Sequence, residues 1–111
     1  MAKEAVKIQE GGVIDYTAGA TIANGDVIPF AAGRIGVALD DAVSGDTISV
    51  AIEGVFEITA ATADEIAVGA EVYFDATNRV LTTTSTDNTL AGMATTAKAA
   101  AAAGSVYVKI G

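Results

Sequence analysis

The chain of 111 residues contains no cysteine, no histidine and no tryptophan. Without cysteine it has no disulfide, no thiolate metal ligand and no cysteine nucleophile. Without histidine it lacks the commonest general base and the commonest transition-metal ligand. These two absences together argue against an enzyme, and we expect no catalytic residue, no metal site and no cofactor.

Basic residues are also scarce, because six Lys and Arg stand against fourteen Asp and Glu, which gives a net charge of −8. A protein that binds nucleic acid needs a basic surface to displace counterions from the phosphates. We therefore expect no nucleic-acid partner, and we interpret the excess of acid as a contribution to solubility.

Long apolar runs are missing as well. No run approaches the 18 or so residues that a membrane helix needs. The first ten residues, MAKEAVKIQE, carry charges where a signal peptide would have an apolar segment. The sequence predicts a soluble protein that is made in the cytoplasm and has no membrane partner.

The residues that are abundant favour strands. The chain has 12 Val, 10 Ile and 13 Thr but only 3 Leu, and β-branched side chains suit a pleated sheet better than a helix. A chain of this length forms one domain with a single core. The composition therefore predicts an all-β protein.

A repeated phrase indicates how the strands are organised. It reads ANGDVIPF, VSGDTISV, AVGAEVYF and AAAGSVYV, and each phrase places a glycine before an alternating run, at Gly25, Gly45, Gly69 and Gly104. Such glycines supply the positive φ of a tight turn. The phrases pair into halves of about 23–58 and 67–111, which we interpret as a weak internal duplication.

The predicted architecture is a compact antiparallel β-sandwich or small barrel, with at most one or two short helical turns. We expect an N-terminal arm at 1–12 and a single β domain at 13–111. The stretch Ala97–Ala103 could form either a helix or a loop. Pro29 predicts an edge strand or a bulge. The predicted strands are 5–9, 13–16, 26–30, 35–39, 47–58, 71–74, 80–84, 90–94 and 106–110.

Residues 47–58 show the most regular alternation, and their even-numbered side chains are predicted to face the core. Gly54 interrupts this apolar face and predicts a bulge or a close backbone approach. Glu53 and Glu57 share the other face about 13 Å apart, too far for a glycosidase pair. The predicted core comprises Ile48, Val50, Ile52, Phe56, Val72, Phe74, Val106 and Val108.

Two further clusters of polar residues are candidate binding sites. Asp40, Asp41 and Asp46 could bind a hard cation, as a metal-dependent hydrolase would require, but aspartate beside such turns is ordinary turn chemistry. The threonine-rich residues 82–89 are better explained as a polar loop than as an adhesive row. No phosphate loop, nucleophile elbow or dinucleotide fingerprint is present.

The pieces IDYT, GDVI, VAIEGVFE and VYFD, in this order along nearly the whole chain, resemble a family of tailed-phage capsid decoration (cement) proteins. Two departures concern local loops: Ile58, Thr59 and Ala60 stand where relatives often have Pro and Lys, and the Ala97–Ala103 stretch is long. Some relatives carry a recombinase label, which a chain with no phosphate loop and a charge of −8 does not support.

The resemblance implies a structural virion protein on the outer surface of a capsid, where it bridges neighbouring major capsid protein subunits as a homo-oligomer, with a trimer favoured over a dimer. The expected contacts are Val6, Ile8, Gln9 and Tyr16, because AVKIQ alternates and could add a strand to a partner's sheet. The same segment could instead pair within its own sheet.

The alternative function is a carbohydrate-binding or adhesion module. It would use Tyr16, Tyr73 and Tyr107 as platforms for sugar rings, together with the threonine-rich loops.

Overall fold

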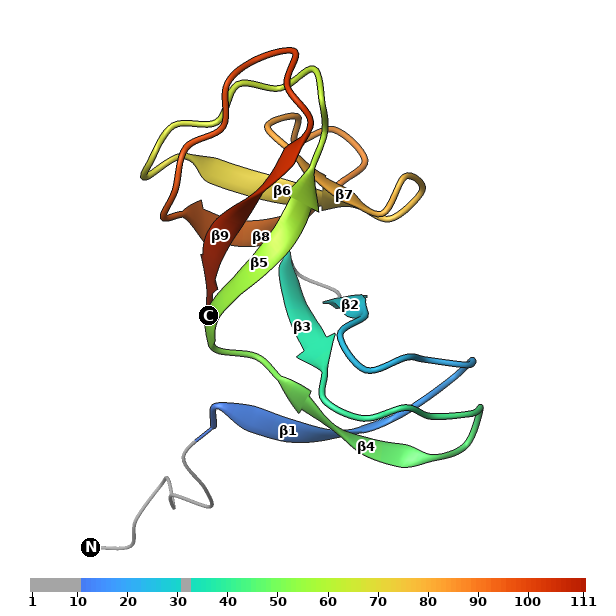
Figure 1. The fold of residues 1–111 in the computed structure, drawn as a ribbon. Helices are drawn as coiled ribbons and strands as arrows, with labels where there is room; N and C mark the ends of the chain where they lie inside the picture. The colour runs from blue at the N-terminus through green and yellow to red at the C-terminus, as the bar shows by residue number, and fades with distance from the viewer. Residues whose placement is uncertain (1–10, 31–32) are drawn as a thin grey trace, which may run out of the picture.

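The computed structural model describes residues 11–30 and 33–111, and this part of the chain is built from strands and turns without a helix (Figure 1). It therefore contains no helix long and apolar enough to cross a membrane. The all-β prediction is confirmed, while the predicted strand at 5–9 lies outside the described residues. The strands are β1 (Val13–Thr17), β2 (Val27–Phe30), β3 (Arg34–Ala38), β4 (Thr47–Ala51), β5 (Gly54–Ala60), β6 (Glu71–Asp75), β7 (Val80–Thr82), β8 (Thr89–Ala94) and β9 (Gly104–Ile110).

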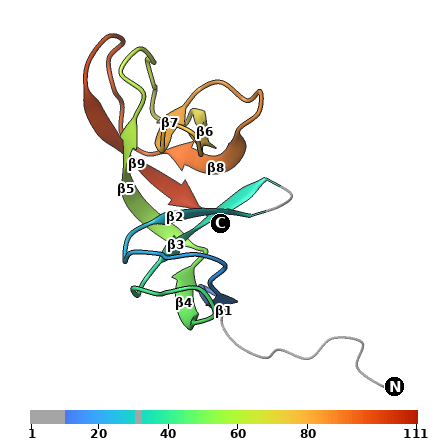
Figure 2. The same cartoon turned by 90° about the vertical axis from the view of Figure 1, so that its right-hand side faces the viewer.

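The strands form two sheets that follow one another along the chain. The first is an open sheet in the order β1-β4-β3-β2, and the second is a closed barrel in the order β5-β7-β6-β8-β9. Figures 1 and 2 show the barrel beside one end of the open sheet, with β3 reaching toward β8 and β9. The structure thus combines a sheet and a small barrel.

The same order of pairing occurs in both sheets. The pairs β1–β4, β2–β3 and β3–β4 of the open sheet correspond to β5–β9, β6–β8 and β8–β9 of the barrel. An isolated antiparallel bridge joins Ile22 to Ala42 in the first unit and Ile66 to Lys98 in the second. Among the described strands only β7 has no counterpart, and its pairing with both β5 and β6 closes the barrel.

The turns before the strands follow the repeated phrase in three of its four copies. Gly25, Gly45 and Gly69 have φ angles of 93°, 96° and 89°, as expected for glycines in tight turns. The fourth copy differs, because Gly104 begins β9 and the positive φ, 55°, lies at Ala101. The fourth strand is therefore introduced by a different loop.

The prediction of one strand over residues 47–58 is wrong. β4 ends at Ala51 and β5 begins at Gly54, whose φ is 125°, so that residues 52 and 53 carry the chain from the open sheet into the barrel (Figure 1). Gly54 therefore lies at the passage between two sheets, and not within a single strand. Even-numbered side chains still face inward in both strands, which is why the alternation conceals the break.

The core consists of two clusters. The larger one fills the barrel and extends to Val27, Ile35 and Val37 of the open sheet, while the smaller one lies within the open sheet around Val50. Six of the eight predicted core residues are buried. The other two, Ile52 and Phe56, are only partly buried and flank the passage between the sheets.

The pairing confirms the prediction made for Pro29. Pro29 lies in β2, an edge strand of the open sheet, opposite Ile35, so its missing N–H leaves the ladder intact. Asp75 begins the hairpin between β6 and β7, where its carboxylate accepts hydrogen bonds from the N–H groups of Thr77 at 2.9 Å and Asn78 at 3.2 Å.

Candidate functional site

Lys98 organises the alanine-rich loop. Its side chain is only 7% exposed, and its Nζ donates hydrogen bonds to the carbonyl oxygens of Thr62 at 3.1 Å, Ala99 at 2.9 Å and Ala102 at 2.8 Å. An ammonium has three protons, so these three bonds satisfy it completely. Residues 97–103 therefore form a turn around Lys98 and not a helix.

Replacing Lys98 with methionine is expected to lower the free energy of unfolding by about 2–4 kcal/mol, because the three carbonyl oxygens lose a charged donor while the volume is kept. Urea denaturation followed by circular dichroism measures the change. Lys109→Met, at an exposed position, is the matched control and should change stability by less than about 0.5 kcal/mol. Equal effects of the two substitutions would contradict the structural role of Lys98.

Asp64 lies beside this loop and is held ionised. The Thr82 hydroxyl donates to its Oδ2 at 2.6 Å and the Thr83 N–H donates to the same oxygen at 3.0 Å. The Thr82 hydrogen bond lowers the pKa of Asp64 most, and the Thr83 N–H and the Lys98 charge lower it further. A general acid needs a raised carboxyl pKa, whereas the pKa of Asp64 is lowered. Its two hydrogen bonds instead connect the segment around Asp64 to Thr82 and Thr83.

The aspartates considered for a cation serve turns. Asp41 Oδ1 accepts the Asn24 N–H at 2.8 Å, Asp46 Oδ2 accepts the Val43 N–H at 3.0 Å, and Asp40 Oδ2 lies 3.5 Å from the amide nitrogen of Ser49. Among the described residues no group of three or more acidic side chains is placed to hold a metal ion. The turn interpretation of these aspartates therefore fits their observed contacts.

The two glutamates of the most regular stretch are separated by the passage between the sheets. Glu53 lies in that passage, while Glu57 lies in β5, where its carboxylate accepts a hydrogen bond from the Ser105 hydroxyl at 2.9 Å. Both side chains are exposed. Glu57 therefore lies on a solvated strand surface, and Glu53 lies on a solvated connection.

The tyrosines come from both sheets. Tyr16 lies in β1, half-buried, with its ring edge-on to Phe30 at a centroid distance of 5.7 Å and an angle of 73°. Tyr73 in β6 donates to Glu71 at 3.3 Å, and Tyr107 in β9 is 50% exposed. Of the predicted contacts, Val6, Ile8 and Gln9 lie outside the described residues, so Tyr16 is the one that the structure places.

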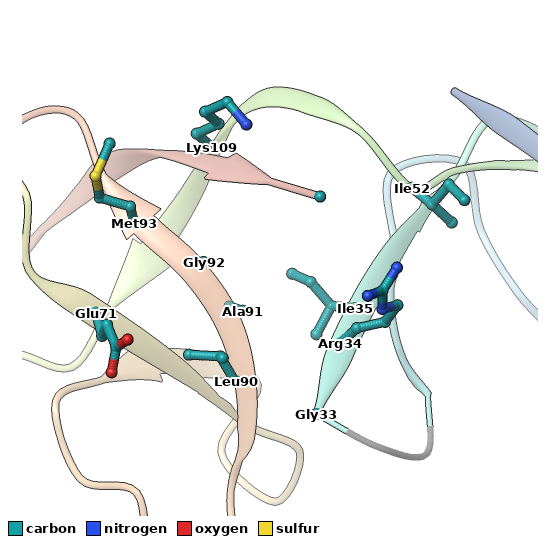
Figure 3. A pocket seen from close by; sticks show the side chains of 11 residues that line it. Gly33, Arg34, Ile35, Ile52, Glu71, Leu90, Ala91, Gly92, Met93 and Lys109 are labelled. Carbon is teal, nitrogen blue, oxygen red and sulfur yellow. The ribbon is translucent and has the colours of Figure 1, made fainter. Parts of the chain in front are cut away.

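A groove between the two sheets was not predicted from the sequence. It has a volume of about 510 Å³ and lies between the start of β3 and the strands β8 and β9 (Figure 3). Most of its lining residues lie in segments that the alternation predicts as strands, and the alternation gives no sign that these strands face one groove. The groove is lined by Gly33, Arg34, Ile35, Ile52, Glu71, Leu90, Ala91, Gly92, Met93, Lys109 and Gly111.

The described side chains build turns, two core clusters and a mainly apolar groove, and they contain no group of three or more side chains placed to hold a metal ion. The chain belongs to the phage cement protein family, because the model of that family matches residues 8–110.

The family match covers nearly the whole chain and confirms the resemblance seen in the sequence. The family name indicates a structural protein that stabilises a phage capsid, and it implies association with the capsid in the virion. No curated protein and no solved structure matches the chain.

Proposed function

We propose that this protein binds the outer surface of an assembled phage capsid and bridges neighbouring major capsid protein subunits. The observation that carries the proposal is the family match over residues 8–110. A protein that crosslinks a shell needs a rigid scaffold and exposed contact surfaces, and it needs no reaction centre. The two-sheet structure fits this requirement.

Assembly of the protein with itself is part of the proposal, with a trimer favoured and a dimer as the next candidate. Several apolar side chains of the barrel are exposed, among them Val55 and Tyr107, and such residues are available for contacts with other copies of the chain. Light scattering should give a mass near three times that of the 11.0 kDa chain. A monomer both in solution and on shells would contradict this part.

Sedimentation with capsids tests the function directly. The protein should co-sediment with expanded shells of its own phage and should raise the temperature at which they disassemble, because each bound copy ties subunits together. Free capsid subunits should bind it weakly or not at all. If expanded shells sediment without the protein, the proposal fails.

The same assay tests the N-terminal contacts that we propose, Val6 and Ile8 together with Gln9 and Tyr16. Val6→Ser combined with Ile8→Ser removes the apolar side of the alternating segment and should weaken shell binding about tenfold. The control Lys7→Ser changes the intervening position and should leave binding within about twofold of wild type. Equal binding by both variants would remove the arm from the interface.

A further inference from the structure

The groove between the sheets has an apolar floor and an open side. Ile35 and Ile52 approach from the side of the open sheet, and Leu90, Ala91 and Met93 from the side of the barrel, as Figure 3 shows. Ile35 and Ala91 are buried, Ile52 and Leu90 are partly buried, and Met93 is 43% exposed at the rim. The groove therefore offers apolar contacts that an incoming segment could cover.

Two basic side chains line this groove, although the protein as a whole has a negative net charge. Of the four basic residues in the described part, Lys98 is bound to three carbonyl oxygens, and Arg79 donates to the Val27 carbonyl oxygen at 2.8 Å and lies over the Phe74 ring. The other two, Arg34 and Lys109, are exposed, form no ion pair within the described part, and both line the groove. Two available cations thus flank one apolar surface in a chain of charge −8.

Glu71, the one acidic side chain among the lining residues, lies on the barrel side of the groove, where its carboxylate accepts the Tyr73 hydroxyl at 3.3 Å. The two basic side chains therefore outnumber the acidic side chain at this groove.

We propose that this groove binds an extended segment of a capsid protein that carries apolar side chains and at least one carboxylate. The carboxylate would pair with Arg34 or Lys109, and the apolar side chains would cover the floor. This inference rests on the proposed capsid function. Residues 1–10 of a second copy fit less well, because they contain two Lys and two Glu and so carry no excess of acid.

Affinity for shells distinguishes this groove from other surfaces. Arg34→Ala combined with Lys109→Ala should weaken binding to expanded shells about tenfold, because both partners of the carboxylate are lost. The control, Thr21→Glu with Ser44→Glu, changes the net charge by the same two units at exposed positions. Ser44 precedes β4, whereas the groove residue Ile52 follows it. The control should stay within about twofold of wild type.

Photocrosslinking identifies the occupant. A benzophenone side chain at position 93 should crosslink to a major capsid protein peptide that contains apolar residues and Asp or Glu, whereas the same group at Val43, which is also exposed, should not label that peptide. A crosslink from position 93 to another copy of this chain would assign the groove to self-assembly and overturn the proposal.

The outcomes separate the two proposals. Normal shell binding by the Arg34→Ala and Lys109→Ala double variant would overturn the groove proposal and leave the capsid function intact. Failure of the wild-type protein to bind expanded shells would overturn both.

Discussion

Replacing Gly92 with alanine is expected to lower the free energy of unfolding by about 3–5 kcal/mol, or to prevent folding altogether. An added Cβ would collide with the carbonyl oxygen of Lys109 in the neighbouring strand β9. The φ of Gly92 is 153°, which side chains rarely adopt, and such strain alone costs roughly 1–3 kcal/mol. Because the obstacle is backbone, a side-chain rotation cannot relieve it, and overpacking adds about 1–3 kcal/mol. Urea denaturation measures the sum.

Two other glycines calibrate this result. Gly19→Ala is the control, because nothing lies within 4 Å of its added Cβ and its φ is not positive, so the change should stay within about 0.5 kcal/mol. Gly36 occupies the place in β3 that Gly92 occupies in β8, but its added Cβ would meet the side chains of Val50 at 2.6 Å and Phe30 at 2.8 Å, and the nearest backbone atom, the Ala51 carbonyl oxygen, only at 3.2 Å. The φ of Gly36 is not positive and its backbone contact is longer than that of Gly92, so Gly36→Ala should fall between the two. If Gly92→Ala had the same free energy of unfolding as the wild type, the predicted collision with the Lys109 carbonyl oxygen would be refuted.

Phe74→Ala should cost about 3–5 kcal/mol, because it leaves a cavity in the barrel core. The side chain is 2% exposed and is the largest of the fully buried ones. Its ring also lies 4.9 Å below the Arg79 guanidinium, so the substitution removes a cation–π contact as well. Chemical denaturation monitored by circular dichroism gives the value.

Phe56→Ala is the matched comparison. Sequence alternation alone gives Phe56 the same expected cost as a core aromatic residue, about 3–5 kcal/mol. The structure leaves Phe56 partly buried beside the passage between the sheets, and we now expect about 1–3 kcal/mol, the transfer free energy without a closed cavity. Equal losses for Phe56→Ala and Phe74→Ala would mean that the two rings are buried alike.

Strands were predictable where alternation and turns agreed. Val72, Phe74, Val106 and Val108 were assigned to the core because each alternates with polar neighbours, and all four are buried. Three of the four phrase glycines have the positive φ expected of them. The alanines of residues 97–103 gave no such indication, because their loop depends on one lysine reaching carbonyl oxygens of two separate segments.

The passage between the sheets was not predictable from alternation. Ile48 to Ile58 keeps one inward parity, and a change of sheet leaves that parity intact. The only sequence signal was Gly54, which alternation alone could explain equally well as a bulge. The groove was hidden for a related reason, because Arg34 and Lys109 are far apart in the sequence and line the same groove only when β3 lies beside the barrel.

The family, in contrast, was recognisable from the sequence, because short pieces such as IDYT and VAIEGVFE occur in order over nearly the whole chain. Those pieces lie largely in strands that build the scaffold. They identify the family without locating its contacts, which depend on side chains brought together by folding.

The short strand β7 closes the barrel, so the barrel and the open sheet differ in whether further strands could add at their edges. Among the described strands, each barrel strand has two neighbours, whereas β1 and β2 at the ends of the open sheet each pair with one, and the β2 edge contains Pro29. A continuous ribbon of copies needs an accepting edge on both sides of each molecule. The described scaffold offers no strand edge in the barrel and an edge obstructed by a proline at β2, so continuous edge-to-edge growth through these strands is disfavoured.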